Sequence, residues 1–130
     1  MKYLISIVLV LLIITAPAYA KKKQAQITFA EQTHDFGKIS EDGGKVSHRF
    51  EFTNTGDANL VILDATADCG CTVPEYPTAP IAPGKKGEIK VTYNPLYRPG
   101  SFTKVVTVRT NSKQKKARVK ITGTVTPRKK

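Results

Sequence analysis

An alternation of apolar and polar side chains with a period of two residues constrains this chain more than any other feature. Between residues 46 and 53, apolar or aromatic side chains at even positions alternate with polar ones at odd positions. The same alternation recurs at residues 89–93 and 117–123. Because successive side chains of a strand point to opposite faces of a sheet, this pattern predicts half-buried β-strands. No window after residue 20 shows the 3.6-residue period of an amphipathic helix, so we expect an all-β fold.

Turn-forming residues separate these runs. Gly43-Gly44 and Asn54-Thr55-Gly56 can supply the positive φ angles that tight turns need. Strands of about five to ten residues with turns at this spacing predict an antiparallel β-sandwich of seven or eight strands. We expect the apolar run at residues 60–63 to be buried on both faces, and four prolines predict an extended, poorly paired connection at residues 72–84. The predicted strands are residues 26–30, 36–40, 45–54, 59–65, 70–73, 87–94, 102–110 and 115–125.

Apolar burial alone is expected to hold the core together. The chain has no tryptophan and only two cysteines, which lie two residues apart and cannot link two sheets. After residue 20, 36 of the 110 residues are hydrophobic, which is enough for one small core but too few for two domains. The expected core residues are Phe36, Phe50, Phe52, Leu60, Ile62, Ile89, Val91, Phe102, Val106, Val119 and Ile121.

Residues 1–20 are predicted to be a signal peptide. Lys2 precedes a nearly unbroken apolar stretch at residues 3–16, which is shorter than the roughly 20 residues that span a bilayer. Pro17 and the small residues of Ala18-Tyr19-Ala20 predict cleavage after residue 20. The lysines at positions 21–23 favour an uncleaved N-terminal anchor as the alternative, because positive charge is normally kept on the cytoplasmic side.

The predicted organisation is therefore a signal peptide, a basic tail at residues 21–25, one domain at residues 26–126 and a basic tail at residues 127–130. Cleavage would leave no membrane span. We expect a periplasmic or secreted protein, in an oxidising setting where two thiols can pair.

Four short motifs follow one another in the chain. They are Asp35-Phe36-Gly37-Lys38-Ile39, Phe52-Thr53-Asn54-Thr55-Gly56-Asp57, Cys69-Gly70-Cys71-Thr72 and Ile81-Ala82-Pro83-Gly84. In this order they resemble domain-of-unknown-function family 1573, over roughly residues 27–125. The resemblance implies a bacterial exported protein and a single immunoglobulin-like sandwich of the PapD and major-sperm-protein kind. It implies no established activity, so it supplies no catalytic residues.

The pair Cys69 and Cys71 is the main candidate for a chemical site. One interpretation is a local disulfide, or a buried thiol pair, that shapes the turn, with Gly70 bringing the sulfurs together. The second is Cu(I) or Zn(II) bound by both thiolates with His34 or His48 as an accessory ligand, although one CxC is incomplete for a closed zinc site. The third is thiol–disulfide exchange, which normally uses CxxC at the start of a helix.

The two histidines have simpler interpretations of their own. His48 falls on the apolar face of its predicted strand, where a hydrogen-bonded core residue is commoner than a ligand. His34 precedes Asp35, and this pair favours a turn cap over a catalytic base with its orienting acid. No hydrolase elbow, phosphate-binding loop, dinucleotide fingerprint or zinc-protease motif occurs. We expect no catalysis and no cofactor.

Charge is divided sharply along the chain. All ten acidic residues lie at or before residue 88, and twelve basic residues follow without an acid. A possible anion-binding stripe consists of Lys113, Lys115, Lys116, Arg118 and Lys120. The simpler interpretation is a solvated face that prevents edge-to-edge association. Nucleic-acid binding is not expected, because the stretch lacks interleaved aromatic residues.

The sequence thus predicts an exported, non-enzymatic module that binds a protein or an anionic component of the cell envelope. It would use its loops or add a strand at a sheet edge. The alternative is a metal-binding or thiol-redox site at Cys69 and Cys71.

Overall fold

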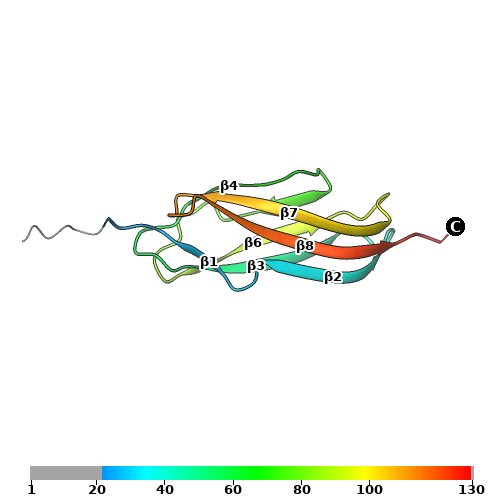
Figure 1. The fold of residues 1–130 in the computed structure, drawn as a ribbon, viewed down its shortest axis with the longest axis horizontal. Helices are drawn as coiled ribbons and strands as arrows, with labels where there is room; N and C mark the ends of the chain where they lie inside the picture. Colours follow the sequence, from blue (N-terminus) through cyan, green and yellow to red (C-terminus); the bar gives the residue numbers. More distant parts are fainter. Residues whose placement is uncertain (1–21, 130) are drawn as a thin grey trace, which may run out of the picture.

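A computed structural model describes residues 22–129 as two stacked four-stranded sheets (Figure 1). One sheet has the strand order β1-β3-β6-β5 and the other β2-β8-β7-β4. The strands are β1 (Ile27–Phe29), β2 (Thr33–Ser40), β3 (Val46–Asn54), β4 (Ile62–Ala67), β5 (Thr72–Glu75), β6 (Lys86–Tyr93), β7 (Gly100–Thr110) and β8 (Lys116–Thr126). The fold is therefore all-β and immunoglobulin-like, as predicted.

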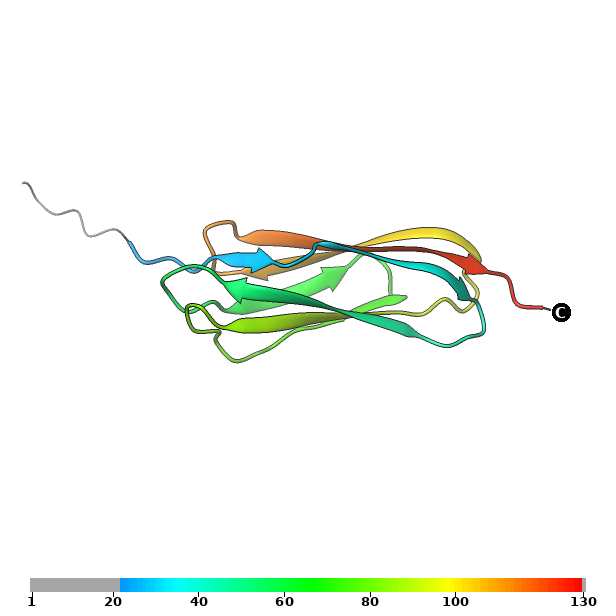
Figure 2. The same ribbon diagram turned by 90° about the horizontal axis from the view of Figure 1, so that it is seen from below.

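One strand pairing departs from the expected antiparallel pattern. The chain crosses from one sheet to the other between β1 and β2, and β2 then runs parallel to β8 (Figure 2). The amide of Lys120 donates to the carbonyl of Gln32 at 2.7 Å, which fixes the point where the crossing chain joins the second sheet. All other strand pairs are antiparallel. No hydrogen-bonded ladder joins β2 to β3 in the described residues. We call this edge of the sandwich, between β2 and β3, the open edge.

Alternation places the core as expected. Ten of the eleven expected core residues are buried; Phe36 is only half-buried and packs against the edge of the core. Tyr93 also belongs to the core, and its ring stacks on that of Phe102 with centroids 4.1 Å apart. Further core residues that the prediction missed are Ala25, Cys71, Val108 and Val125.

Two local predictions are wrong. Leu63 is 53% exposed rather than buried, because the ladder between β4 and β7 shifts register between Ile62 and Asp64. The first four residues of the proline-rich connection are not unpaired, because they form β5 against β6. Pro74 is tolerated there because β5 is an edge strand, where one side of the backbone has no ladder to lose.

The ordered domain begins earlier than the predicted boundary at residue 26. Gln24 and Asp57 exchange hydrogen bonds, and the carbonyl of Ala25 accepts from the amide of Lys113 at 3.2 Å. Ala25 is buried, so part of the predicted basic tail is held in the fold. The predicted signal peptide lies outside the described residues. Within residues 22–129, no helix is long and apolar enough to cross a membrane.

Candidate functional site

The Cys69-Gly70-Cys71 segment forms the turn between β4 and β5. The structure joins the two cysteines as a disulfide, with their Cα atoms 5.1 Å apart. Cys71 is buried, and its carbonyl accepts from the amide of Asn94 at 2.9 Å. The predicted strand at residues 70–73 is displaced, since β5 begins only at Thr72. This arrangement supports the first interpretation, a local disulfide that shapes the turn.

A small cavity of about 290 Å³ lies beside this disulfide, between β4 and β7. Its lining includes Ala67, Cys69 and Lys104. Lys104 is half-buried on the inner side of β7, where the alternation with Phe102 and Val106 places it. In the disulfide form neither sulfur is a thiolate, so neither can serve as a soft-metal ligand.

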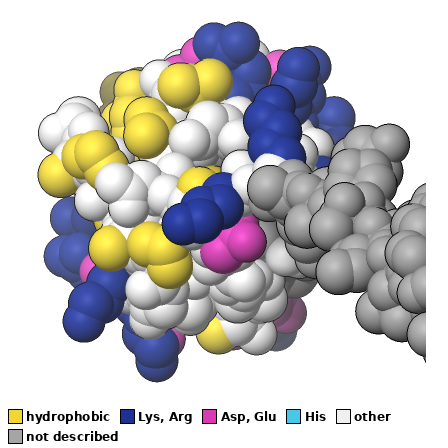
Figure 3. Space-filling view, turned by 90° about the vertical axis from the view of Figure 1, so that its left-hand side faces the viewer, with side chains coloured by type: hydrophobic (Ala, Val, Ile, Leu, Met, Phe, Trp, Pro, Cys, Tyr) yellow, Lys and Arg dark blue, Asp and Glu magenta, His cyan; other side chains and the backbone are white. Residues whose placement is uncertain are grey.

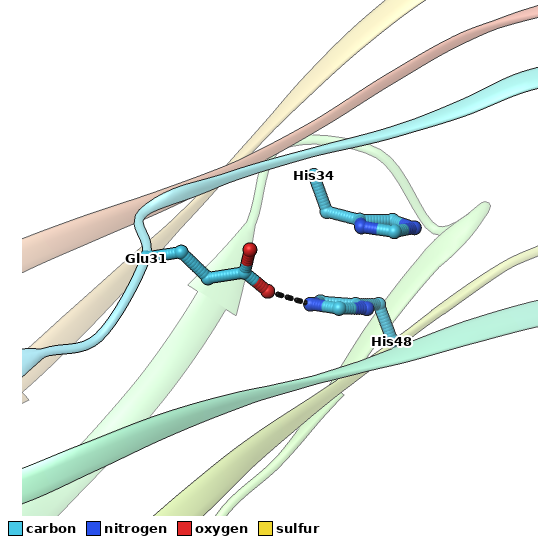
Figure 4. A group of neighbouring side chains, drawn as sticks. All are labelled: Glu31, His34 and His48. Carbon is cyan, nitrogen blue, oxygen red and sulfur yellow. Dashed lines mark hydrogen bonds and ion pairs between the residues drawn. The ribbon is translucent and has the colours of Figure 1, made fainter.

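The two histidine rings contact each other and not the cysteines (Figure 4). The His34 ring from β2 stacks on the His48 ring from β3, with centroids 3.6 Å apart and planes 6° from parallel. Nε2 of His48 is paired with Oε1 of Glu31, which lies in the crossover before β2. His34 also touches Phe36, and His48 touches Phe50, each in an edge-to-face contact. The group therefore packs between β2 and β3 at the open edge of the sandwich.

The surroundings of His34 affect its protonation. Partial burial and the neighbouring His48 lower the pKa of His34, and the charges of Glu31 and Asp35 oppose this shift. His34 is thus neutral at neutral pH, with its lone pair free to accept a proton or a metal ion. Asp35 caps the turn that follows it, as predicted: its carboxylate accepts a hydrogen bond from the amide of Gly37 at 2.8 Å.

The histidines and the cysteines lie at opposite edges of the sandwich. β2 is the first strand of its sheet and β4 the last, while the cysteine turn joins β4 to β5, the last strand of the other sheet. The possible metal-ligand group in the described residues contains Glu31, His34 and His48 but no cysteine. The structure therefore does not bring the histidines together with Cys69 and Cys71 as accessory ligands.

The basic residues occupy one face and one end of the molecule. Lys116, Arg118 and Lys120 alternate on the exposed face of β8, as the period-two pattern predicts. Lys113 and Lys115 lie in the exposed loop between β7 and β8. Figure 3 views the end that holds this loop, and dark blue Lys and Arg side chains crowd its rim while magenta acids are few. Among residues 22–129, none of these five residues forms an ion pair.

The loop between β6 and β7 carries a feature that sequence reasoning missed. The amide of Arg98 donates to the carbonyl of Pro95 at 3.0 Å, which closes a tight turn with Tyr97 at its third position. Tyr97 has a φ of 63° and is 72% exposed, although glycine or asparagine is normal where a turn needs positive φ. The guanidinium of Arg128 lies 5.1 Å from the centre of its ring. One sign of this turn is visible in the sequence: an aromatic residue lies between Pro95 and Pro99, in a segment without strand alternation.

Comparisons with solved structures agree with this fold. A protein of unknown function from Porphyromonas gingivalis W83 is similar, with a TM-score of 0.69 and 16% identity over 85% of this chain and 51% of that one. This chain thus spans about half the length of that protein. A PapD-like domain of human CEP192 has a TM-score of 0.59 and 12% identity over 88% of this chain and 94% of the domain.

The Vibrio cholerae secreted serine protease VesC is also similar, with a TM-score of 0.58 and 15% identity over 76% of this chain but only 23% of that one. At these identities the likeness concerns the fold alone. No curated protein sequence matches this chain. Residues 27–125 match the family described as protein of unknown function, DUF1573, and the chain belongs to that family.

Proposed function

We propose that this domain is an exported, non-enzymatic binding module of the cell envelope, which docks a partner protein on the loop between β6 and β7. The PapD-like and immunoglobulin-like fold supports a non-enzymatic role, because such sandwiches usually present loops and edges to partners. The apolar stretch at residues 3–16 and the Cys69–Cys71 disulfide support export into an oxidising compartment. Intact mass of the protein recovered outside the cytoplasm tests this part, with a mature chain beginning at Lys21 as the expected result.

The observation that carries the docking proposal is the exposed, left-handed backbone of Tyr97. A left-handed residue other than glycine costs about 1–2 kcal/mol, and nothing in the interior gains from this ring, which is 72% exposed. Strained backbone tends to occur where a function needs it. Tyrosine and arginine are also the residue types that contribute most to protein interfaces, and Arg128 supports the ring from one side. Leu96 adds a second exposed apolar side chain next to it.

Site-specific photo-crosslinking in the producing cells tests this proposal. A benzophenone amino acid at Leu96 is expected to form one predominant crosslinked product with a partner protein. The same amino acid at Leu63, which is 53% exposed against 38% for Leu96 and lies on β4 near the other end of the sandwich, is the control and is expected to form none. Identical products from both positions would contradict a specific docking surface.

A second variant separates docking from folding. Tyr97→Gly removes the ring and the left-handed strain of about 1–2 kcal/mol, at an entropy cost of about 0.5–1 kcal/mol for the added glycine. The free energy of unfolding should therefore be unchanged or slightly raised, while the crosslink from position 96 is lost. A crosslink that persists in this variant would show that Tyr97 is not part of the interface.

A second candidate function rests on the cationic residues of β8. Lys116, Arg118 and Lys120 are exposed on one face without ion pairs in the described chain, an arrangement that favours contact with an anionic envelope component.

A further inference from the structure

The group of Glu31, His34 and His48 combines side chains from three separate segments at the open edge of the sandwich. The three offer one ligand atom each, and these atoms all lie within 4.8 Å of one another (Figure 4). His34 belongs to β2 of one sheet, His48 to β3 of the other, and Glu31 to the crossover between them. The group therefore exists only because the chain changes sheets at this point.

The hydrogen bonding of the group is incomplete. His48 is paired with Glu31, but within the described residues the ring nitrogens of His34 have no hydrogen-bond partner. Hydrophobic packing alone would favour an apolar side chain at position 34, which touches Phe36 and lies over the His48 ring. The Glu31 side chain is 49% exposed and that of His48 is 21% exposed, so an ion can reach the group from solvent.

We propose that Glu31, His34 and His48 bind a zinc ion, which links the two sheets at their open edge. Two imidazole nitrogens and one carboxylate oxygen are ordinary ligands of Zn²⁺, and three protein ligands leave a fourth position for water. The disulfide at the opposite edge takes no part. This site differs from the cysteine-based metal site predicted from the sequence, because its ligands include no sulfur.

Zinc binding requires one modest rearrangement. The imidazole planes are nearly parallel, so their nitrogen lone pairs do not yet point toward one ion. Rotation of a histidine ring about its Cβ–Cγ bond is soft, and turning one ring lets the lone pairs converge. Zn²⁺ imposes no geometry through its d electrons, so it tolerates an imperfect tetrahedron. The bound ion would replace the stacking contact and take the Glu31 carboxylate from His48.

The charges around the group suit a divalent ion. The negative charges of Glu31 and Asp35 act on His34 and would offset part of the positive charge of the ion. Two protonated histidines at this separation would repel each other, whereas one shared cation removes that repulsion.

Isothermal titration of Zn²⁺ into the untagged protein, with its disulfide intact, tests the proposal. We expect one ion per chain at pH 7.5 and weaker binding below about pH 6, where protons compete for the histidines. Glu31→Gln, His34→Gln and His48→Gln should each weaken binding by about tenfold or more, since even an outer hydrogen-bond partner of a ligand is worth about 10–100-fold. Thermal unfolding of the metal-free variants verifies that each one folds.

Two matched controls make the outcome decisive. Glu88→Gln removes an exposed carboxylate from β6 and should leave zinc affinity unchanged. Replacing both cysteines with serine should also leave it unchanged, which separates this site from a thiolate site. Full zinc affinity in any one of the three ligand variants, or no binding by the native protein, would overturn the proposal.

Discussion

The two sheets are built alike on the inside and differently on the outside. Inside, each sheet places a phenylalanine ring over a glycine of the neighbouring strand. Phe52 of β3 is paired with Gly87 of β6, and Phe102 of β7 with Gly123 of β8. A Cβ atom added at either glycine would lie 2.5 Å or 2.8 Å from the facing ring, so both positions exclude larger residues. The same packing solution thus appears on both sides of the core.

The outer faces differ in how their charges are compensated. On the β3–β6 sheet, acids and bases pair across neighbouring strands: Arg49 with Glu88 and Lys86 with Glu51 diagonally, and Lys90 with the directly opposite Glu75. On the other sheet, β8 carries its cations with no acid of its own. The difference follows from the sequence, because the last acid is Glu88 and β7 and β8 come after it. Core packing is therefore symmetric while charge is not.

Removing the rings tests the symmetry of the interior and should give the largest effects. Phe52→Ala and Phe102→Ala each leave a cavity above a glycine that has no side chain to fill it. Each is expected to lower the free energy of unfolding by about 3–5 kcal/mol, measured by urea denaturation. Leu63→Ala, at an exposed position, is the control and should change it by less than about 0.5 kcal/mol. A large effect from only one of the two rings would show that a single sheet dominates the core.

Alternation predicted this interior well because it reports which face of a strand is buried. It could not show that Leu63 is exposed, since the register shift in β4 depends on how β7 pairs with it. The parallel pairing of β2 with β8 was hidden for a similar reason. A sequence period does not reveal which sheet a strand joins, and a crossover of three residues carries little local signal.

The candidate sites were predicted unevenly. The cysteine turn was visible because two cysteines so close in sequence have few other partners. Each histidine was identified, but their contact was not, because residues 34 and 48 meet only through the crossover between sheets. Glu31 gave no usable signal, and the only signal for Tyr97 was its place between Pro95 and Pro99, since both features depend on how the backbone is placed rather than on residue type.

Variants that remove charge compare the two outer faces, and their effect on binding to anionic vesicles should be the next largest. Lys116→Gln, Arg118→Gln and Lys120→Gln are combined in one protein and tested on vesicles that contain anionic lipid. Each basic residue near such a surface contributes about 1 kcal/mol, so affinity at low salt should fall on the order of a hundredfold. Raising the salt concentration should weaken the native protein toward the variant, because the interaction is screened.

A matched variant on the other sheet separates local from total charge. Arg49→Gln, Lys86→Gln and Lys90→Gln remove the same number of positive charges, but these residues are already paired with acids. Their combined loss should weaken vesicle binding much less than the loss of the β8 residues. Equal losses from the two triple variants would show that only the net charge of the protein matters.

The smallest expected effect on stability comes from Asp64, which pairs with Arg109 on the outer face of the β7–β8 sheet. Nε of Arg109 donates to both carboxylate oxygens of Asp64 at 2.9 Å, and this contact lowers the pKa of Asp64 from its usual value of 3.8. Because the folded pKa is below the unfolded one, the pair stabilises the fold fully above about pH 4, and this contribution is lost as the pH falls through the folded pKa. Asp64→Asn should therefore lower the urea midpoint slightly at neutral pH, and the difference from the native protein should vanish in acid, once Asp64 is protonated in the folded state as well. Since the pair is exposed, the difference in urea midpoint should also shrink in high salt. An NMR titration that gave Asp64 the pKa of a free carboxyl would contradict a stabilising ion pair with Arg109.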